Sequence, residues 1–435
     1  MRMTTCRGKV RAVVPSLKNN IAALYGVQLA NYAIPLLTLP CLTRVLEPDG
    51  FGRFSFCIAC NAYLVMLVDY GFNFSATQEI ARHRDDKAAR SKIFWATIAV
   101  KTLLAIAGFA MLLASTYLSA RMSADRSLLL AGYLAVVGSL LTPAWYFQGT
   151  EDLALLSAIT VFFRLLSVPL TYALVTTRDN VLVAIIIAAA PSVAAGLMCL
   201  GVLLFRRALL FVTVSRRDLV VTLVEGWHLF LSTAAISLYS TTNVVLLGIV
   251  AGNSAVGYFS AAEKIAKAAA GLMSPVSQSF YPRISRLIDE SKEEAFALIR
   301  RLLRAQAAIG LTISVGIMLT AAYAVPLLYG PAFSETVALL RWLSPLPFLL
   351  ALSNVLGVQT MLPLRMKRAV SSILVFCGAL NVMLLYALAS YFGATGAAVS
   401  VLTAEALVTA LMCLALWLKQ VPIFPQRMTH GQFRN

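Results

Sequence analysis

The stretch VLVAIIIAAAPSVAAGLMCLGVLLF, residues 181–205, decides the fold, because it carries no charged side chain over a length that can cross a bilayer as a helix. The chain of 435 residues is 60% hydrophobic and 13% charged, whereas soluble domains are about 45–50% apolar and ~25% charged. Comparable runs lie near residues 19–43, 54–76, 93–119, 127–149, 153–176, 219–250, 258–281, 305–330, 338–362, 369–392 and 394–418. We therefore predict an all-α polytopic membrane protein with about 12 transmembrane helices of ~20 residues or more.

The positive charges predict how these spans are oriented. With the N-terminus in the cytoplasm, 26 of the 36 Lys and Arg residues fall in cytoplasmic segments, 6 in segments on the opposite side and 4 inside spans. Lys and Arg concentrate in the cytoplasmic loops of membrane proteins, so we expect both termini in the cytoplasm. The net charge of +17 is then a topology signal spread over short loops, and nucleic-acid binding is not expected.

A short repeat indicates two halves of similar layout. Gly52-Arg-Phe-Ser follows the first span and Gly257-Tyr-Phe-Ser follows the seventh. An even number of spans separates the copies, so both halves would share one orientation about a pseudo-two-fold axis along the membrane normal. The predicted segments are a basic N-terminus (1–18), a first six-helix lobe (19–205), a linker (206–218), a second six-helix lobe (219–418) and a tail (419–435). Inside the second lobe, basic and apolar residues of the long cytoplasmic loop 282–304 predict an amphipathic helix on the membrane surface.

The sequence lacks the motifs that are typical of ATP hydrolysis and of metal binding. It contains neither a G-x-x-x-x-G-K-[ST] phosphate loop nor H-E-x-x-H nor a His/Cys cluster with metal-ligand spacing. Cys57 and Cys60 form a C-x-x-C inside a span, where small packing residues are common. No cleavable signal peptide is expected, because the apolar run after the basic N-terminus is too long for one. We predict that the protein is not an enzyme and binds no metal or cofactor.

Charged residues inside the spans are the best candidates for function, because each costs several kcal/mol unless it faces a cavity or a partner. The cations are Lys101, Arg164, Lys264 and Lys267, and the acids are Asp69, Glu225, Glu263 and Glu405. They can line a water-filled cavity in which cations hold an anionic substrate and acids couple or gate transport. They can instead form ion pairs that fix helix packing, as Glu263 and Lys267 can at i,i+4. The residues alone indicate a two-lobed, ATP-independent transporter and leave its substrate open.

Several motifs run in order along the chain from about residue 19 to residue 418. They are QLANYAIPLLTLP (28–40), TRVLEPDGFG (43–52), DYGFNFSATQEIAR (69–82), PAWYFQGTE (143–151), GYFSAAEK (257–264), YPRISR (281–286) and SNVLGVQTMLP (353–363). These motifs resemble the polysaccharide transporter family, the Wzx or RfbX type flippases of the multidrug/oligosaccharidyl-lipid/polysaccharide exporter superfamily.

The resemblance implies a fold and a transport activity. The fold would be a V-shaped, MATE-like bundle of two six-helix lobes that alternates between inward-open and outward-open states. The substrates would be undecaprenyl-pyrophosphate-linked oligosaccharide repeat units, which move from the cytoplasmic to the periplasmic leaflet of the bacterial inner membrane for O-antigen, capsule or exopolysaccharide (lipopolysaccharide) assembly. An ion gradient would supply the energy. Membrane lipids, a polysaccharide polymerase and chain-length machinery would be the partners.

The resemblance also implies roles for particular residues. Binding of the pyrophosphate would fall to buried cations, namely Arg164, Lys101, Lys264 and Lys267. The sugar would contact polar and aromatic groups of the cavity, namely Gln28, Asn31, Trp145, Gln148, Tyr239, Asn243 and Gln359. Ion coupling or gating would involve Asp69, Glu225, Glu405 and Arg44.

Two other functions are alternatives for the same sequence. A multidrug/cation antiporter of the same superfamily would keep the fold but needs a cavity dominated by acids. The four cations and four acids inside the spans do not separate it from a flippase, and drug-resistance assays would. A membrane glycosyltransferase or polymerase needs a long periplasmic loop for its catalytic residues, and the predicted outer loops are too short for one. We therefore expect a flippase.

Overall fold

The computed structural model describes residues 17–423, and the side chains of residues 17–33, 228, 229, 232–240 and 275 fall outside that description. Helices make up the described chain, as expected where a backbone must satisfy its hydrogen bonds within one segment. The first half contains α1 (Leu17–Asp69), α2 (Phe72–Arg82), α3 (Lys87–Leu118), α4 (Ala120–Ala124), α5 (Arg126–Gly132), α6 (Leu134–Leu141), α7 (Ala144–Gly149), α8 (Leu153–Leu174) and α9 (Val181–Phe205).

The second half begins with the long helix that follows the linker. It contains α10 (Arg216–Val250), α11 (Gly252–Gly271), α12 (Ser274–Glu290), α13 (Lys292–Tyr329), the 3₁₀ helix η1 (Pro331–Phe333), α14 (Ser334–Leu343), α15 (Leu346–Ser353), the π-helix η2 (Asn354–Met361) and α16 (Lys367–Leu418). Pro345 precedes α15 and fits the start of a helix, where its missing N–H is not needed.

Eight helical stretches of the described chain are long and apolar enough to cross a membrane. Two of them, Ile34–Arg82 and Lys367–Leu418, contain 49 and 52 residues, about twice the ~20 residues that one span needs. The backbone is not helical at Glu47, inside α1, where φ is 55°, and at Gly393, inside α16, where φ is 53°. Each long helix is therefore divided into two consecutive segments, and the chain is an all-α, multi-span membrane protein.

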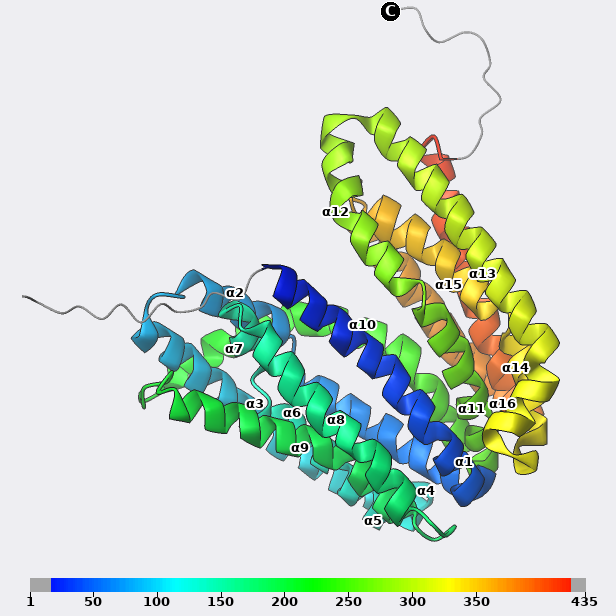
Figure 1. Ribbon diagram of the computed structural model, residues 1–435, viewed down its shortest axis with the longest axis horizontal. Coiled ribbons are helices and arrows are strands. Elements are labelled where there is room, and N and C mark those ends of the chain that lie inside the picture. The colour runs from blue at the N-terminus through cyan, green and yellow to red at the C-terminus, as the bar shows by residue number, and fades with distance from the viewer. Residues whose placement is uncertain (1–16, 424–435) are drawn as a thin grey trace, which may run out of the picture.

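The helices form two arms that meet at one end and diverge toward the other (Figure 1). The first arm contains α2–α9 and the second contains α12–α16, and α1 packs against α11 where the arms meet. Phe51, Phe259, Tyr329 and Phe333 belong to a buried cluster at this junction. Because lipid tails are as apolar as these side chains, close packing holds the arms together more than exclusion of water does.

Four helices end in the same hydrogen-bonded turn, and its central residue adopts a positive φ. At Gln420 (φ 52°), the backbone N–H donates to Trp417 O at 2.9 Å, and Val421 N–H donates to Leu416 O at 3.1 Å. This Schellman pattern satisfies carbonyls that a helix end leaves unpaired. The other residues that occupy this position are Glu151, Arg207 and Arg365. A residue with a Cβ costs roughly 1–2 kcal/mol in this conformation.

Replacing Gln420 by glycine should therefore stabilise the protein. Glycine relieves the strained φ, so we expect Gln420→Gly to raise the free energy of unfolding by about 1 kcal/mol, after subtracting the entropy that glycine adds to the unfolded chain. Thermal unfolding of the purified protein in detergent measures the change. Gln420→Ala keeps the Cβ and is the matched control. An equal gain from both variants would show that strain at this position is not the cause.

The segment 282–304 differs from the expected surface helix. It contains the end of α12 and the start of α13, and its apolar residues point into the protein instead of toward a membrane. Ile284 is fully buried, and Phe296 is 8% exposed, in a cluster with Met412 and Leu416 of α16. The two helices therefore form a hairpin that extends the second arm (Figure 1), because their apolar faces find partners within the fold.

Candidate substrate-binding site

A cavity of about 350 Å³ lies in the first arm, and we call it the first-arm cavity. Residues of α1, α6, α8 and α9 form most of its wall. Its polar lining consists of Asp69, Asn73, Ser139, Thr142, Thr160, Arg164 and Ser192. Two of the residues expected to act in transport, Arg164 and Asp69, thus face one space.

Lys101 stands behind this cavity in an ion pair with Asp69. Its ammonium donates to Asp69 Oδ1 at 3.0 Å and to Ser139 O at 2.8 Å. The hydroxyl of Ser139 donates to the same carboxylate oxygen at 2.5 Å. Lys101 is 2% exposed and the side chain of Asp69 is 33% exposed, so only the carboxylate is open to the cavity. A buried ammonium needs such a partner, because an isolated charge in an apolar interior is costly.

Arg164 supplies the cavity with a cation on its open side. It projects from the middle of α8, and its side chain is exposed. The net charge of Lys101, Asp69 and Arg164 together is about +1 when all three are ionised, because the charges of Lys101 and Asp69 cancel. A guanidinium presents five N–H donors in a flat fork that matches the oxygens of a phosphate. The first-arm cavity can therefore hold an anionic group.

Lys264 and Lys267 lie on α11 and contact residues that do not line the first-arm cavity. The ammonium of Lys264 lies 4.7 Å from the centre of the Phe51 ring, a cation–π contact between α11 and α1. The ammonium of Lys267 lies 2.8 Å from Glu263 Oε1. The structure thus brings together two of the four expected cations, Lys101 and Arg164, and places the other two elsewhere.

A larger cavity, of about 540 Å³, lies in the second arm, and we call it the second-arm cavity. It is enclosed by α11, α12, α13, α15, η2 and α16. Its polar lining consists of Lys267, Ser274, Ser277, Gln306, Ser353, Asn354 and Glu405. Glu405, expected to couple or gate, is 8% exposed here.

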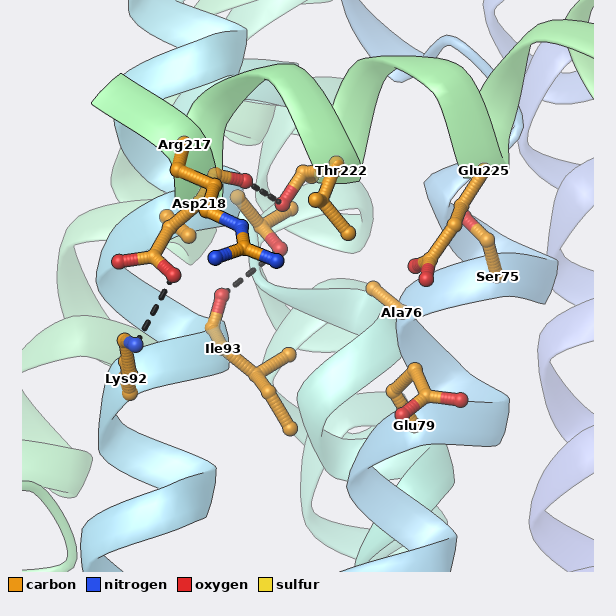
Figure 2. Close-up of a pocket in the computed structure, with 12 residues that line it drawn as sticks. Ser75, Ala76, Glu79, Lys92, Ile93, Arg217, Asp218, Thr222 and Glu225 are labelled. Atoms are coloured by element: carbon orange, nitrogen blue, oxygen red, sulfur yellow. Dashed lines mark hydrogen bonds and ion pairs between the residues drawn. The ribbon is translucent and has the colours of Figure 1, made fainter. Parts of the chain in front are cut away.

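A third cavity, of about 210 Å³, lies between α2, α3 and the start of α10 (Figure 2). Glu225 points from α10 toward Ser75 of α2 in this view. At the other side of the cavity, Lys92 lies 2.9 Å from Asp218, and hydrogen bonding from Lys92 lowers the pKa of Asp218 to about 2. The three acids expected to couple or gate transport therefore occupy three different cavities.

Two of the residues expected to contact sugar are packed within the first arm. Trp145 is fully buried, and its ring centre lies 5.4 Å from that of Phe94. Gln148 accepts a hydrogen bond of 3.3 Å from the hydroxyl of Thr77, which ties α7 to α2. Neither residue lines any of the three cavities. In this structure both hold helices together.

Asn243 and Gln359 are buried in contacts between helices. Asn381 of α16 donates to Asn243 Oδ1 of α10 at 2.8 Å. Gln359 donates through Nε2 to Ser277 O at 2.8 Å, at the back of the second-arm cavity. The side chains of the other expected sugar contacts, Gln28, Asn31 and Tyr239, lie outside the described residues.

The two copies of the short repeat pack against each other where the arms meet. A Cβ added to Gly52 would lie 1.9 Å from Asn253 O, and a Cβ added to Gly257 would lie 2.1 Å from Pro48 O. Real Cβ atoms do not approach backbone this closely, so only glycine fits at either position. The repeat is therefore a reciprocal contact between α1 and α11.

Two arginines bridge the arms beside these glycines. Arg44 of α1 donates to Leu327 O of α13, and Arg121 of α4 donates to Gly248 O at 3.2 Å. Arg121 also donates to the side chain of Asn253. We call Gly52, Gly257, Arg44 and Arg121 together the interarm seal.

Asp125 holds the second of these arginines in place. Its carboxylate is almost fully buried and lies 2.7 Å from Arg121 and 2.7 Å from Arg53. Sequence reasoning missed Arg121, Asp125 and Asn253, because they lie at helix ends, where only Lys and Arg were counted and only as a signal of topology. Within the part of the chain that the structure describes, no group of three His, Cys, Asp or Glu is placed to hold a metal ion.

This architecture is that of an all-α, multi-span membrane protein with a MATE-like and MurJ-like fold. An inward-facing multidrug resistance MATE family transporter of the MOP superfamily superposes with a TM-score of 0.64 at 15% identity, over 93% of this chain and 99% of that chain. The lipid II flippase MurJ in an inward closed conformation superposes with a TM-score of 0.71 at 10% identity, over 92% of this chain and 88% of that chain. At these identities the likeness concerns the fold alone.

Sequence similarity gives the family. The profile of the family described as "Polysaccharide biosynthesis protein" matches residues 17–288. A proposed O-antigen transporter of Escherichia coli (strain K12) is 38% identical over 397 residues, which cover 91% of this chain and 96% of that protein. Another, of Shigella dysenteriae, is 29% identical over 92% of this chain and 100% of that protein. The chain therefore belongs to the polysaccharide biosynthesis protein family, and it is a transporter and not an enzyme.

Proposed function

We propose that this protein is a flippase that moves undecaprenyl-pyrophosphate-linked oligosaccharides from the cytoplasmic to the periplasmic leaflet of the bacterial inner membrane. The family and the proposed O-antigen transporter at 38% identity support the substrate class. The observation that carries the proposal is the first-arm cavity, where Arg164 stands beside the Lys101–Asp69 pair. A pyrophosphate needs cations in a site that excludes most water, and this cavity offers them.

We assign the chain twelve spans in two six-helix lobes, residues 19–205 and 219–418. The breaks at Glu47 and Gly393 support two spans in each of the longest helices, and α10 and α11 supply the seventh and eighth spans. The distribution of Lys and Arg supports cytoplasmic termini. In this orientation the arms in Figure 1 diverge toward the cytoplasm, which is an inward-open state with the interarm seal at the periplasmic end.

Labelling of the α12–α13 hairpin tests this orientation. A small tag inserted after Asp289, at the end of α12, should react with a membrane-impermeant reagent only in inverted inner-membrane vesicles, because the hairpin then lies in the cytoplasm. A second tag at Arg178, between α8 and α9, should react only in intact spheroplasts. The reverse pattern at both tags would overturn the assigned orientation.

Asp69 is our candidate for coupling to an ion gradient, because its carboxylate is open to the first-arm cavity and pairs with the ammonium of Lys101 at 3.0 Å. An inward gradient drives export only if the ion and the substrate compete for the protein. Binding of the ion from the periplasmic side would therefore have to displace the pyrophosphate.

Deletion of the gene tests the proposed function directly. We expect lipid-linked oligosaccharide to accumulate in the inner membrane, protected in intact spheroplasts from enzymes added outside and open to them in inverted vesicles. Restoring the gene should return the glycan to the outer side, where a polymerase and chain-length proteins would receive it. Normal glycan together with increased sensitivity to cationic drugs would instead indicate the multidrug antiporter.

A further inference from the structure

Two buried hydrogen-bond acceptors belong to residues in the wall of the second-arm cavity and receive no donor from the described residues. Gln306 is 1% exposed, and its Nε2 donates to the hydroxyl of Ser277 at 2.8 Å. Its Oε1 and Asn354 Oδ1 are buried and receive no hydrogen bond from the described residues. Buried polar atoms are usually paired, so two such oxygens at one cavity mark a place where a water molecule or a ligand can donate.

Gln359 extends the same pattern behind the cavity wall. Its Nε2 donates to Ser277 O at 2.8 Å, and its Oε1 also receives no donor among the described residues. Asn354 and Gln359 both belong to η2, a π-helical stretch between α15 and the turn before α16. Such stretches are uncommon and often lie at functional sites. The amide side chains of Asn354 and Gln359 therefore both lie on a stretch whose backbone departs from the regular α-helix.

Charge distinguishes this cavity from the one in the first arm. Lys267 and Glu263 form an ion pair with each other, so their charges cancel. Glu405 adds a largely buried carboxylate to the lining of the second-arm cavity, whereas the guanidinium of Arg164 lines the first-arm cavity together with Asp69. A substrate that occupies both would need an anionic part and a part that is rich in donors but not anionic.

The volume of the second-arm cavity and the groups that line it indicate which chemical class of ligand fits it. Its volume of about 540 Å³ falls within the ~300–1,000 Å³ range of small-molecule sites, whereas a single ion would fill only a small share of it. Hydroxyl groups and amide N–H groups are the donors that match carboxylate and amide oxygens. A sugar residue carries several of these groups on one rigid ring.

We propose that the second-arm cavity is a glycan subsite that binds a neutral or N-acetylated sugar residue of the lipid-linked substrate through Gln306, Asn354 and Glu405. This inference rests on the proposed function and adds to it which sugars the protein would accept. A uronic acid would be rejected, because its carboxylate would face Glu405. With the pyrophosphate at Arg164 and the sugar at Gln306, one substrate would contact both arms and favour their closure over it.

A comparison of three synthetic lipids tests the proposal on the full-length protein in nanodiscs. The probes are farnesyl pyrophosphate, the same lipid carrying N-acetylglucosamine, and the same lipid carrying glucuronic acid. The native protein should bind the N-acetylglucosamine lipid at least tenfold more tightly than the bare lipid, and the glucuronic acid lipid no more tightly than the bare one. Gln306→Leu and Glu405→Gln should abolish the tenfold gain without changing the affinity for the bare lipid.

Control variants separate the subsite from the proposed function and from misfolding. Gln278→Leu changes an exposed glutamine of α12 that does not line the cavity, and it should behave as the native protein. Asn354→Ala removes one acceptor and leaves Gln306 in place, so it should lose part of the gain while keeping its melting temperature. Arg164→Ala should weaken binding of all three lipids, which reports on the pyrophosphate site alone.

The remaining outcomes overturn the glycan subsite. Equal affinity of the native protein for the bare and N-acetylglucosamine lipids would remove it and leave the proposed function intact. Stabilisation of the native protein by Na⁺, lost in Glu405→Gln, together with no preference for the sugar, would make the cavity a cation site. Failure of the native protein to bind any of the three lipids would remove the proposed function and the subsite with it.

Discussion

Arg164→Ala is expected to abolish export of the lipid-linked oligosaccharide while the protein still accumulates in the inner membrane. The residue lines the first-arm cavity with an exposed guanidinium, and Lys101 beside it is already engaged by Asp69. A hydrogen bond to a charged group contributes roughly 1.5–3 kcal/mol, so loss of the guanidinium should weaken binding of the pyrophosphate by about a hundredfold. Surface glycan measured in a deletion strain that carries the variant gives the result.

Two further variants make this result specific to the guanidinium. Arg164→Lys keeps the charge but loses the planar fork, so we expect partial export. Arg216→Ala removes an exposed arginine at the start of α10, far along the chain from the cavity lining, and should export normally. Glycan at the native level from Arg164→Ala, with equal amounts of protein, would show that the first-arm cavity does not bind the pyrophosphate.

Gly257→Leu is expected to prevent the arms from meeting at the interarm seal. The new side chain would begin 2.1 Å from Pro48 O, and backbone atoms of α1 cannot rotate out of its way as a side chain could. Overpacking of an interior commonly costs about 1–3 kcal/mol, and a clash with backbone lies at the upper end of that range. The sealed state should therefore lose most of its population, and export should stop.

Labelling of a cysteine placed at Ala255, a partly buried residue near the start of α11, in a variant without the native cysteines, measures this change. The cysteine should react with an impermeant reagent from the periplasm much faster when Gly257 is leucine. Gly316→Leu is the matched control, because a Cβ at Gly316 of α13 meets no atom within 4 Å. Slow labelling in both variants, with native export, would show that the reciprocal glycine contact does not hold the seal.

The fold could be predicted from the sequence to the extent that apolar length determines it. The runs of uncharged residues predicted the helices, whereas the two six-helix lobes expected from the glycine repeat stay a prediction. The segment 282–304 was expected on the membrane surface, because its pattern of basic and apolar residues fits a lipid surface as well as it fits a protein core. Only the burial of Ile284 and Phe296 in the core cluster of the second arm distinguishes the two cases.

The candidate site was less predictable, because it depends on how separate helices are rotated. Lys101 and Asp69 were both placed within spans, but hydropathy contains no information on whether two helices turn their charged faces toward each other. Their pairing at 3.0 Å appears only in the structure. Trp145 was expected at the cavity for its aromatic ring, and the break at Pro143 turns the short helix α7 so that this ring faces the core.

The hydrogen bonds of the interarm seal end mainly on main-chain carbonyls. Arg44 contacts the carbonyl of Leu327, and Arg121 contacts the carbonyl of Gly248. Every amino acid carries that acceptor, so Leu327 of the second arm can diverge during evolution without losing the bond. The two arginines have no such freedom. Mutational tolerance should therefore be asymmetric across this contact, low at the donors and high at Leu327.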